Sequence, residues 1–483
     1  MSLKKTPVAK PGGSRAGSLS GSYALRAAKQ ASRSTDKAAG DQRPSLTALI
    51  DTKCKINPNV REEAIATPER SAAAGVSPKS NCRRPQLHPP QNSLSPLPCE
   101  PRFITPSPLH LERWAHGPVD SAGSIVNLSD RPSLCMSLMG TQAAIGSSDH
   151  AVYMVDVPSA QFRKALYGGN RGHTEWVTCI SHLPDGRILS GGMDSKLCLW
   201  DRTGSRCTDL LSHTASISSL KVAPNGCLAL SSSYDKSILL WDLGIGKGSR
   251  VNQKPLASLQ GHRAPVMAFA LGSSHTNNNI SNIASGCREG AVILWDACTC
   301  SAILQCKQAH TGHVTALECL GDKETIGPDV FLSGGQDGAL QVWDFRVRYP
   351  VHRAVLHSSS KGQGALSCIS VSSNSACGCP LVVTGGADKL MKVIDPCFSF
   401  QVVHTLSHHR DFIYSLFASG SLAWSGSGDG SILVHDLISG KCLYGLGASA
   451  NGAVRCIGMT VAHQQDYLIC TGDDGNVMMY TKP

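Results

Sequence analysis

The 483-residue sequence has few aromatic side chains, no long apolar run and no apolar segment behind its basic start. Phe, Trp and Tyr make up only 5% of the chain, so its core must rest on many small aliphatic and Cys side chains. No apolar run approaches the roughly 18 residues that span a bilayer, which excludes a membrane-spanning helix. The start MSLKKTPVAK lacks the apolar stretch of a secretory signal, so we expect a cytoplasmic, nuclear or cytoskeletal protein.

Cysteine is plentiful, with 20 residues, but the spacing typical of metal ligands is missing. The sequence contains no CxxC pair. Its CxC pairs, Cys298/Cys300 and Cys377/Cys379, have no His at ligand spacing. We therefore predict no metal site and no cofactor.

The net positive charge is confined to the first quarter of the chain. Residues 1–119 hold 18 Lys+Arg and 8 Asp+Glu and so carry the whole net charge of +10, because the remainder has 27 of each. They also hold 15 of the 26 prolines and show no hydrophobic periodicity, which predicts a disordered basic arm. Such an arm fits an acidic partner, a microtubule or a nucleic acid, and would make the chain a tethered adaptor. A solvated tail is the alternative.

Residues 120–483 repeat one hairpin pattern. Its clearest copy is FLSGGQDGALQVWDFR at 331–346, in which two short apolar runs flank Gly and Asp residues suited to a turn. The copies are marked by turn acids at intervals of 41 to 54 residues: Asp149, Asp194, Asp235, Glu289, Asp337, Asp388, Asp429 and Asp474. A period near 45 with four short strands per copy is typical of β-propeller blades.

Trp-Asp closes the hairpin in the four best copies, at Trp200-Asp201, Trp241-Asp242, Trp295-Asp296 and Trp343-Asp344. In this the chain resembles the WD-repeat family over residues 120–483. The resemblance implies an all-β propeller, with eight blades expected and seven as the alternative. The last copy leaves three residues after Tyr480, too few for a fourth strand, so we expect a strand at 124–128 to complete that blade and close the ring.

Five copies carry a His four residues before the first strand and a Ser four residues before the turn acid. By resemblance to the family, these residues and the Trp form a buried hydrogen-bond network in each blade. The expected network residues are His173, Ser190, Asp194, Trp200, His213, Ser231, Asp235, Trp241, His262, Ser285, Glu289, Trp295, His310, Ser333, Asp337, Trp343, His409, Ser425 and Asp429. A catalytic Ser-His-Asp triad occurs once per domain, whereas this set recurs at one register, so we predict that the chain is not an enzyme.

The resemblance implies a non-catalytic scaffold that assembles a multiprotein complex through its propeller faces. In WD-repeat proteins, the ring end that carries the turn acids usually receives partners. The large aromatic and Arg side chains expected there are Trp176, Tyr234, Arg288 and Phe412. Packing against the neighbouring blade is the alternative role for each of them.

Residues 331–346 also resemble the box found in substrate receptors of cullin-RING ubiquitin ligases, which ends here in Trp343-Asp344-Phe345-Arg346. In those receptors the Arg contacts the propeller-shaped adaptor of the ligase, so Arg346 is a second expected partner contact. Arg also occurs at this place in propellers with no ligase role. The substrate receptor is therefore an alternative to the general scaffold.

Overall fold

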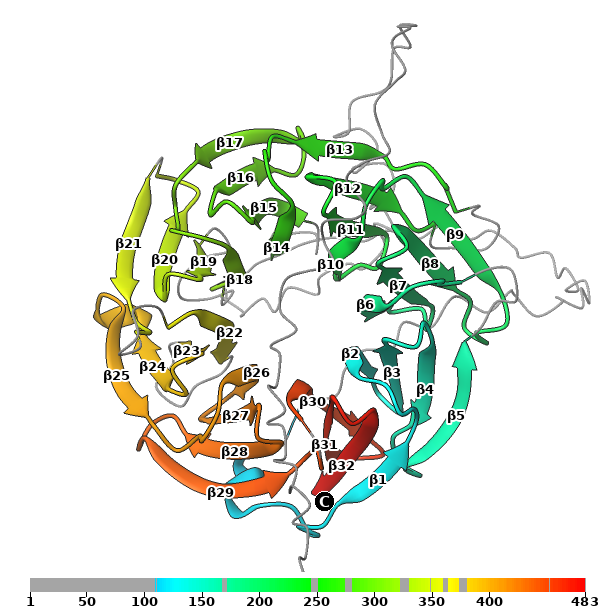
Figure 1. The fold of residues 1–483 in the computed structure, drawn as a ribbon, viewed down its shortest axis with the longest axis vertical. Helices are drawn as coiled ribbons and strands as arrows, with labels where there is room; N and C mark the ends of the chain where they lie inside the picture. The colour runs from blue at the N-terminus through cyan, green and yellow to red at the C-terminus, as the bar shows by residue number, and fades with distance from the viewer. Residues whose placement is uncertain are drawn as a thin grey trace, which may run out of the picture. The chain divides into compact units, whose positions relative to one another are not determined.

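The computed structural model describes residues 109, 111–166, 172–244, 251–273, 280–321, 330–347, 349–358, 364–372, 380–450 and 452–482. These residues form eight four-stranded antiparallel sheets arranged as blades around a ring (Figure 1). The prediction of an all-β propeller with eight blades is therefore confirmed. Residues 1–108 of the predicted arm lie outside the described residues. Among those described, no helix has the length and apolarity needed to cross a membrane.

The first four blades follow one another along the chain, each with its strands in sequence order from the inside of the ring outward. Blade 1 contains β2 (Ser133–Met139), β3 (Gln142–Ser147), β4 (Val152–Asp156) and β5 (Gln161–Leu166). Blade 2 contains β6 (Val177–His182), β7 (Ile188–Gly192), β8 (Lys196–Trp200) and β9 (Cys207–Leu211). Blade 3 contains β10 (Ile217–Val222), β11 (Leu228–Ser233), β12 (Ser237–Asp242) and β13 (Ala257–Gln260). Blade 4 contains β14 (Val266–Ser273), β15 (Ile280–Cys287), β16 (Val292–Asp296) and β17 (Ser301–Cys306).

The remaining blades keep this plan, except that the last one takes its outer strand from the beginning of the described chain. Blade 5 contains β18 (Val314–Cys319), β19 (Val330–Gly335), β20 (Ala339–Asp344) and β21 (Pro350–Val355). Blade 6 contains β22 (Leu366–Ser372), β23 (Leu381–Gly386), β24 (Met391–Asp395) and β25 (Gln401–Leu406), with the 3₁₀ turn η3 (Pro396–Phe398) between the last two. Blade 7 contains β26 (Ile413–Ser419), β27 (Leu422–Ser427), β28 (Ser431–Asp436) and β29 (Lys441–Gly447). Blade 8 contains β30 (Val454–Ala462), β31 (Gln465–Gly472), β32 (Asn476–Lys482) and β1 (Ser124–Asn127).

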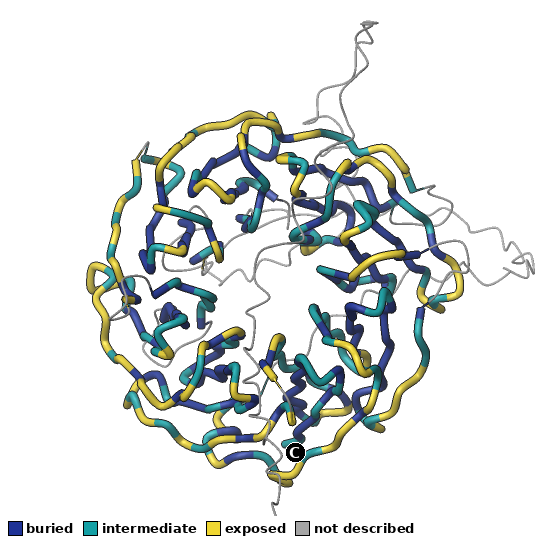
Figure 2. Tube along the Cα trace, viewed as in Figure 1, coloured by how far each residue is buried: buried dark blue, intermediate teal, exposed yellow. Residues whose placement is uncertain are grey.

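The core lies between the blades and is built from their second and third strands. The second strand of blade 5, β19, is buried at every residue, whereas its outer strand β21 alternates between half-buried and exposed residues. Figure 2 shows the same contrast around the ring, with buried middle strands and a largely exposed rim. The first strands of successive blades contact one another all the way round, from β2 to β30 and back to β2. The small aliphatic side chains thus pack as inter-blade layers, which explains how a chain with few aromatics builds a large core.

Each turn acid begins a tight turn whose next residue has a positive φ angle, and this holds in all eight blades. In blade 2 that residue is Ser195 (φ 62°), and in blade 5 it is Gly338 (φ 70°). A side chain on Gly338 would also collide with the carbonyl of His357, so glycine is required there on two grounds. The left-handed residue reverses the chain between the second and third strands, and in blades 2, 3, 5 and 6 the acid points back to a buried His.

The ring is closed by β1, which pairs antiparallel with β32 so that Ser124 lies opposite Met479. The structured region also begins earlier than residue 120, the start predicted for the propeller. A 3₁₀ helix, η2 (Leu111–His116), buries Trp114 completely, edge-on against Trp424 at a centroid distance of 6.4 Å. Tyr444 of β29 donates a hydrogen bond of 2.7 Å to the Trp114 carbonyl. The ordered contacts thus begin before the expected start at residue 120, because this aromatic contact holds the chain against blade 7 before the closing strand begins.

Candidate interaction surface

A chain of hydrogen bonds runs through the interior of blade 2. The Trp200 indole donates to Ser190 Oγ at 3.0 Å, and His173 Nε2 lies 2.8 Å from the same oxygen. His173 Nδ1 lies 3.1 Å from an Asp194 carboxylate oxygen. All donors are satisfied when Ser190 donates to Nε2 and the proton of the ring is on Nδ1, which Asp194 accepts.

Asp194 also holds two backbone segments together. Its carboxylate accepts the N–H of Thr174 from the loop before blade 2 at 2.9 Å and that of Lys196 from its own turn at 3.2 Å. Burial opposes ionisation, but these bonds and the one from His173 outweigh it and hold the pKa of Asp194 below its ordinary value. The network therefore fastens the turn, the preceding loop and the blade interior to one another.

The same four-residue network is complete in blades 2, 3 and 5. In blade 4, His262 bonds Ser285, but its Nδ1 has no hydrogen-bond partner, because Glu289 is exposed and does not reach it. In blade 7, His409 bonds Ser425 at 2.6 Å, while Asp429 turns away to Ser431. The complete sets are His173, Ser190, Asp194 and Trp200; His213, Ser231, Asp235 and Trp241; and His310, Ser333, Asp337 and Trp343.

Blade 6 contains a network that the sequence analysis missed. His357 Nε2 lies 3.0 Å from Thr384 Oγ1, and its Nδ1 lies 2.9 Å from Asp388. Thr384 lies four residues before the turn acid, where five other blades have Ser, so the sequence could have predicted its place in a network. His357 was hidden because a longer loop places it nine residues, not four, before β22.

We call the ring end that carries the turn acids the upper face. In every complete blade, the residue before the turn acid donates its N–H to the loop that precedes the blade, as Met193 does to the Trp176 carbonyl at 2.8 Å. This bond presents both side chains outward. Trp176 is 45% exposed, and Tyr234 and Phe412 are exposed to similar extents. Arg288 is exposed too, with its Nε 3.4 Å from His313 Nε2 of blade 5.

Three of these four predicted contacts belong to one arc of the upper face, from blade 7 to blade 3. Near Phe412, Tyr414 stacks under the Arg455 guanidinium at 5.1 Å. Arg455 and Trp176 line one hollow of about 660 Å³. From Trp176, backbone and side-chain hydrogen bonds lead through Met193 and Ser216 to Tyr234. Arg288 stands apart from this arc, beside blade 5.

Tyr414 and Arg455 were not predicted, although their positions carry a signal. The second residue of the first strand is Thr178, Ser218, Thr315 or Ser367 in four blades, and each hydroxyl bonds a carbonyl of the next blade. Blades 7 and 8 replace this small hydroxyl with Tyr414 and Arg455. A large polar or aromatic side chain at a position that carries a small hydroxyl in four blades indicates a surface role.

Arg346 lies in the turn between the third and fourth strands of blade 5, at the opposite end of the ring, which we call the lower face. Its side chain is 69% exposed. The guanidinium is held by Asp344, with Nη2 donating at 2.6 Å and Nε at 2.9 Å. Hydrogen bonds from Arg346 hold the pKa of Asp344 below its usual range. The guanidinium is thus accessible but fixed in direction.

The repeat chemistry agrees with comparisons with known proteins. The family model described as "WD domain, G-beta repeat" matches residues 166–201, 204–242, 253–296, 301–344 and 400–436. The chain is a WD-repeat protein. It is 27% identical to the protein tipD of Dictyostelium discoideum over 56% of this chain and 41% of that protein. It is 23% identical to a guanine nucleotide-binding protein subunit beta of Zea mays over 64% of this chain and 70% of that subunit.

Among solved structures, this WD-repeat chain superposes on Saccharomyces cerevisiae Sqt1 with a TM-score of 0.64 at 15% identity, covering 75% of this chain and all of that one. That likeness concerns the fold. Because the chain spans less than half the length of tipD, the activity of that whole protein does not carry over. The WD-repeat fold is typical of non-catalytic interaction scaffolds.

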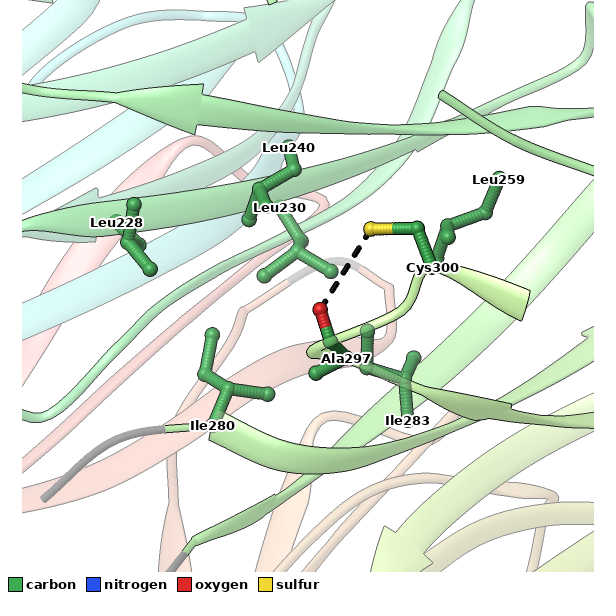
Figure 3. Close-up of a pocket in the computed structure, with 8 residues that line it drawn as sticks. All are labelled: Leu228, Leu230, Leu240, Leu259, Ile280, Ile283, Ala297 and Cys300. Carbon is green, nitrogen blue, oxygen red and sulfur yellow. Dashed lines mark hydrogen bonds between the residues drawn. The ribbon is translucent and has the colours of Figure 1, made fainter. Parts of the chain in front are cut away.

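A small cavity of the WD-repeat core lies between blades 3 and 4 (Figure 3). Its lining is aliphatic apart from one thiol, and Cys300 Sγ lies 3.5 Å from the Ala297 carbonyl. The void measures about 10 Å³, no more than one water. It is lined by Leu228, Leu230, Leu240, Leu259, Ile280, Ile283, Ala297 and Cys300. A packing defect of this size offers no room for a small-molecule substrate.

Asp194→Ala should destabilise this WD-repeat chain more than Glu289→Ala. The first change leaves the His173 ring and two backbone N–H groups without their acceptor, at a cost of about 1–3 kcal/mol. The second removes an exposed carboxylate and should cost under about 0.5 kcal/mol. Thermal unfolding of both variants beside the parent protein measures the difference. Equal shifts in melting temperature would contradict the structural role assigned to the network.

Proposed function

We propose that this protein is a scaffold that assembles a multiprotein complex by docking a partner protein on the upper-face arc. The observation that carries the proposal is the arc itself, in which Trp176 and Arg455 line one hollow and further half-exposed aromatic side chains extend the surface to either side. Trp, Tyr and Arg are the side chains that dominate protein interfaces, because they bury large areas at low entropic cost. The name of one relative, a guanine nucleotide-binding protein subunit, supports this proposal by describing a component of a larger assembly.

The electrostatics of the arc favour a partner segment that is mainly apolar. Arg455 is neutralised by Asp473, whose carboxylate lies 2.7 Å from its Nε, and its guanidinium covers the Tyr414 ring. Asp149 at the other side of the hollow is bonded to Ser129 and Tyr153. Because the Arg455 and Asp149 charges are satisfied internally, the surface available to a partner consists mostly of aromatic rings, the Met193 side chain and one exposed cation, Arg131. Arg288 lies outside the arc and would contact the rim of a larger partner.

Photo-cross-linking in cells tests the proposed docking surface. A benzophenone amino acid replaces Met193 of the arc, next to Trp176, and the matched control carries it at Phe162, a similarly exposed residue of the outer strand β5. We expect one or a few discrete adducts from position 193 and none of these from position 162. The same adducts from both positions would show that contact is not specific to the upper face.

The second candidate is the substrate receptor of a cullin-RING ligase, favoured by the exposure of Arg346 on the lower face. Asp344 fixes the guanidinium in one orientation, which reduces the entropy lost when a partner carbonyl or carboxylate binds it. The two functions are compatible, since one uses the upper face and the other the lower face.

Arg346→Ala should abolish co-purification of the cullin adaptor and leave the melting temperature within about a degree or two, because exposed substitutions usually cost under about 0.5 kcal/mol. Arg346→Lys should fail as well, since an ammonium group cannot reproduce the two-pronged contact. Arg202→Ala, an exposed Arg beside Trp200-Asp201 of blade 2, is the matched control. Adaptor binding by Arg346→Ala at the parental level, or no adaptor with the parent protein, would refute the receptor role.

A further inference from the structure

Blade 7 departs from the WD-repeat pattern at the position of the Trp. Its third strand, β28, carries His435 where blades 2 to 5 carry an indole. In those blades the indole N–H donates to the Ser of the network, as Trp200 does to Ser190. Ser425 of blade 7 is instead bonded by His409 and reaches the Leu433 carbonyl at 3.3 Å, so His435 takes no part in the network.

The His435 ring is buried and has no hydrogen-bond partner in the structure. The residue is only 1% exposed, and both Nδ1 and Nε2 are unpartnered. A buried polar atom without a partner costs roughly 1–3 kcal/mol, so such atoms are rare and need a physical explanation. A ligand that accepts a lone pair of the imidazole would supply that explanation.

Two further ligand-type side chains surround this ring. Cys442 of β29 lies directly opposite His435 in the antiparallel pair, which places both side chains on one face of the blade. His408, from the loop between β25 and β26, has its ring centroid 5.4 Å from that of His435. One atom of each of these three residues lies within 4.8 Å of the other two.

We propose that His408, His435 and Cys442 form a binding site for one zinc ion, with a fourth position open to solvent. Two imidazoles and one thiolate are a borderline-soft donor set that suits zinc. Zinc–ligand bonds of about 2.0–2.3 Å in a tetrahedron separate the donor atoms by roughly 3.3–3.8 Å. The donor atoms now lie within 4.8 Å of one another, and a small rotation of the exposed His408 side chain would bring them into that range. This site was not predicted from sequence, because its residues are distant along the chain and share no motif.

A second cluster of metal-ligand side chains, in blade 2, differs from the blade 7 cluster in its hydrogen bonding. Cys198, Cys207 and Asp209 of blade 2 also lie close together, but the Cys207 thiol already donates to the Asp209 carboxylate at 3.2 Å, and the Cys198 thiol approaches the same oxygen. Those groups satisfy one another without an ion. Only the blade 7 cluster, among the described residues, combines ligand geometry with a buried imidazole whose two nitrogens are unpartnered.

Zinc at this site would fasten the outer strand pair of blade 7 to the loop that leads into the blade. The ion would thus take the place of the hydrogen bond that the Trp indole donates to the Ser in blades 2 to 5. The same loop carries Phe412, three residues beyond His409, so the ion would also stiffen one end of the upper-face arc. The zinc site does not depend on the proposed docking function, because it rests on other residues.

The test uses the full-length protein, stripped with a chelator and titrated with zinc against a chromophoric competitor. We expect one zinc ion per chain, a rise in melting temperature on zinc addition, and a thiolate-to-metal absorption band when cobalt replaces zinc. His408→Ala, at an exposed position that should not disturb folding, and Cys442→Ala should each lower the affinity at least tenfold and remove the zinc-dependent rise. Cys397→Ala, an exposed Cys outside the cluster, should behave as the parent protein.

Two outcomes would overturn the assignment. One is a parent protein that shows neither a zinc-dependent rise in melting temperature nor the cobalt band. The other is zinc binding that survives in His408→Ala but is lost in Cys207→Ala, which would place the ion at the blade 2 cluster.

Discussion

A chain shortened to begin at residue 129 should lose the cooperative unfolding transition of the full-length protein. The deletion removes β1, the outer strand of blade 8, and leaves β32 as an unpaired edge. It also removes Trp114, which is completely buried against Trp424. Loss of a buried Trp side chain alone costs about 3–5 kcal/mol, a large part of the stability of an ordinary domain.

Two other starting points separate the contributions of the strand and the Trp. A chain that begins at residue 109 keeps both and should melt within about a degree or two of the full-length protein. A chain that begins at 120 keeps β1 but loses Trp114 and the bond from Tyr444, so it should melt well below the first. Full-length Trp114→Ala should reproduce this intermediate stability. Equal melting of the chains that begin at 109 and 120 would show that η2 is not part of the propeller.

Trp176→Ala should weaken binding of the upper-face partner by roughly 30-fold or more, since interface hot spots are worth about 2 kcal/mol or more each. Trp176 is the largest exposed side chain of the arc and borders its hollow, so a partner group inserted there would lose most of its contact. Because nearly half of the side chain is exposed, the change should leave the melting temperature almost unchanged. A partner identified by cross-linking serves as the ligand in an equilibrium titration.

Phe162→Ala provides the matched control for that titration, because Phe162 is also about half-exposed but lies on the outer strand of blade 1. It should bind the partner with parental affinity. An unchanged dissociation constant for Trp176→Ala would remove this residue from the interface and favour its alternative role in packing beside Arg455.

The blade number and most of the hydrogen-bond network could be predicted from the sequence because both recur at a fixed spacing. A turn acid followed by a left-handed residue identifies a blade even where Trp is missing, as with Asp388 and Lys389. A Ser or Thr four residues before the acid identifies the network. Local spacing was sufficient for these features because each of them lies within one blade and the loop that precedes it.

What the sequence could not show depends on contacts between distant segments. Trp114 stands in a stretch without hydrophobic periodicity, and only the fold brings it against Trp424, 310 residues later. The sequence did not indicate a ligand role for His435 either, since many repeats lack the Trp at this position. The burial of His435 beside His408 depends on how the loop before blade 7 folds. Arg288 was grouped with Trp176 because repeat position alone does not tell how far apart two blades place their side chains.

Quantitative affinity-capture mass spectrometry with the full-length protein tests the docking role of the upper face most directly. The parent protein is compared with a variant that carries Ala at Trp176, Tyr234, Arg288 and Phe412 together, and with Phe162→Ala. All three should melt within a few degrees of one another, because none of the changed side chains is buried. We predict that the stoichiometric partners captured by the parent and by Phe162→Ala are depleted at least tenfold with the four-residue variant. Recovery of the same partners in the same amounts with that variant would contradict the assignment of the upper face as the docking surface.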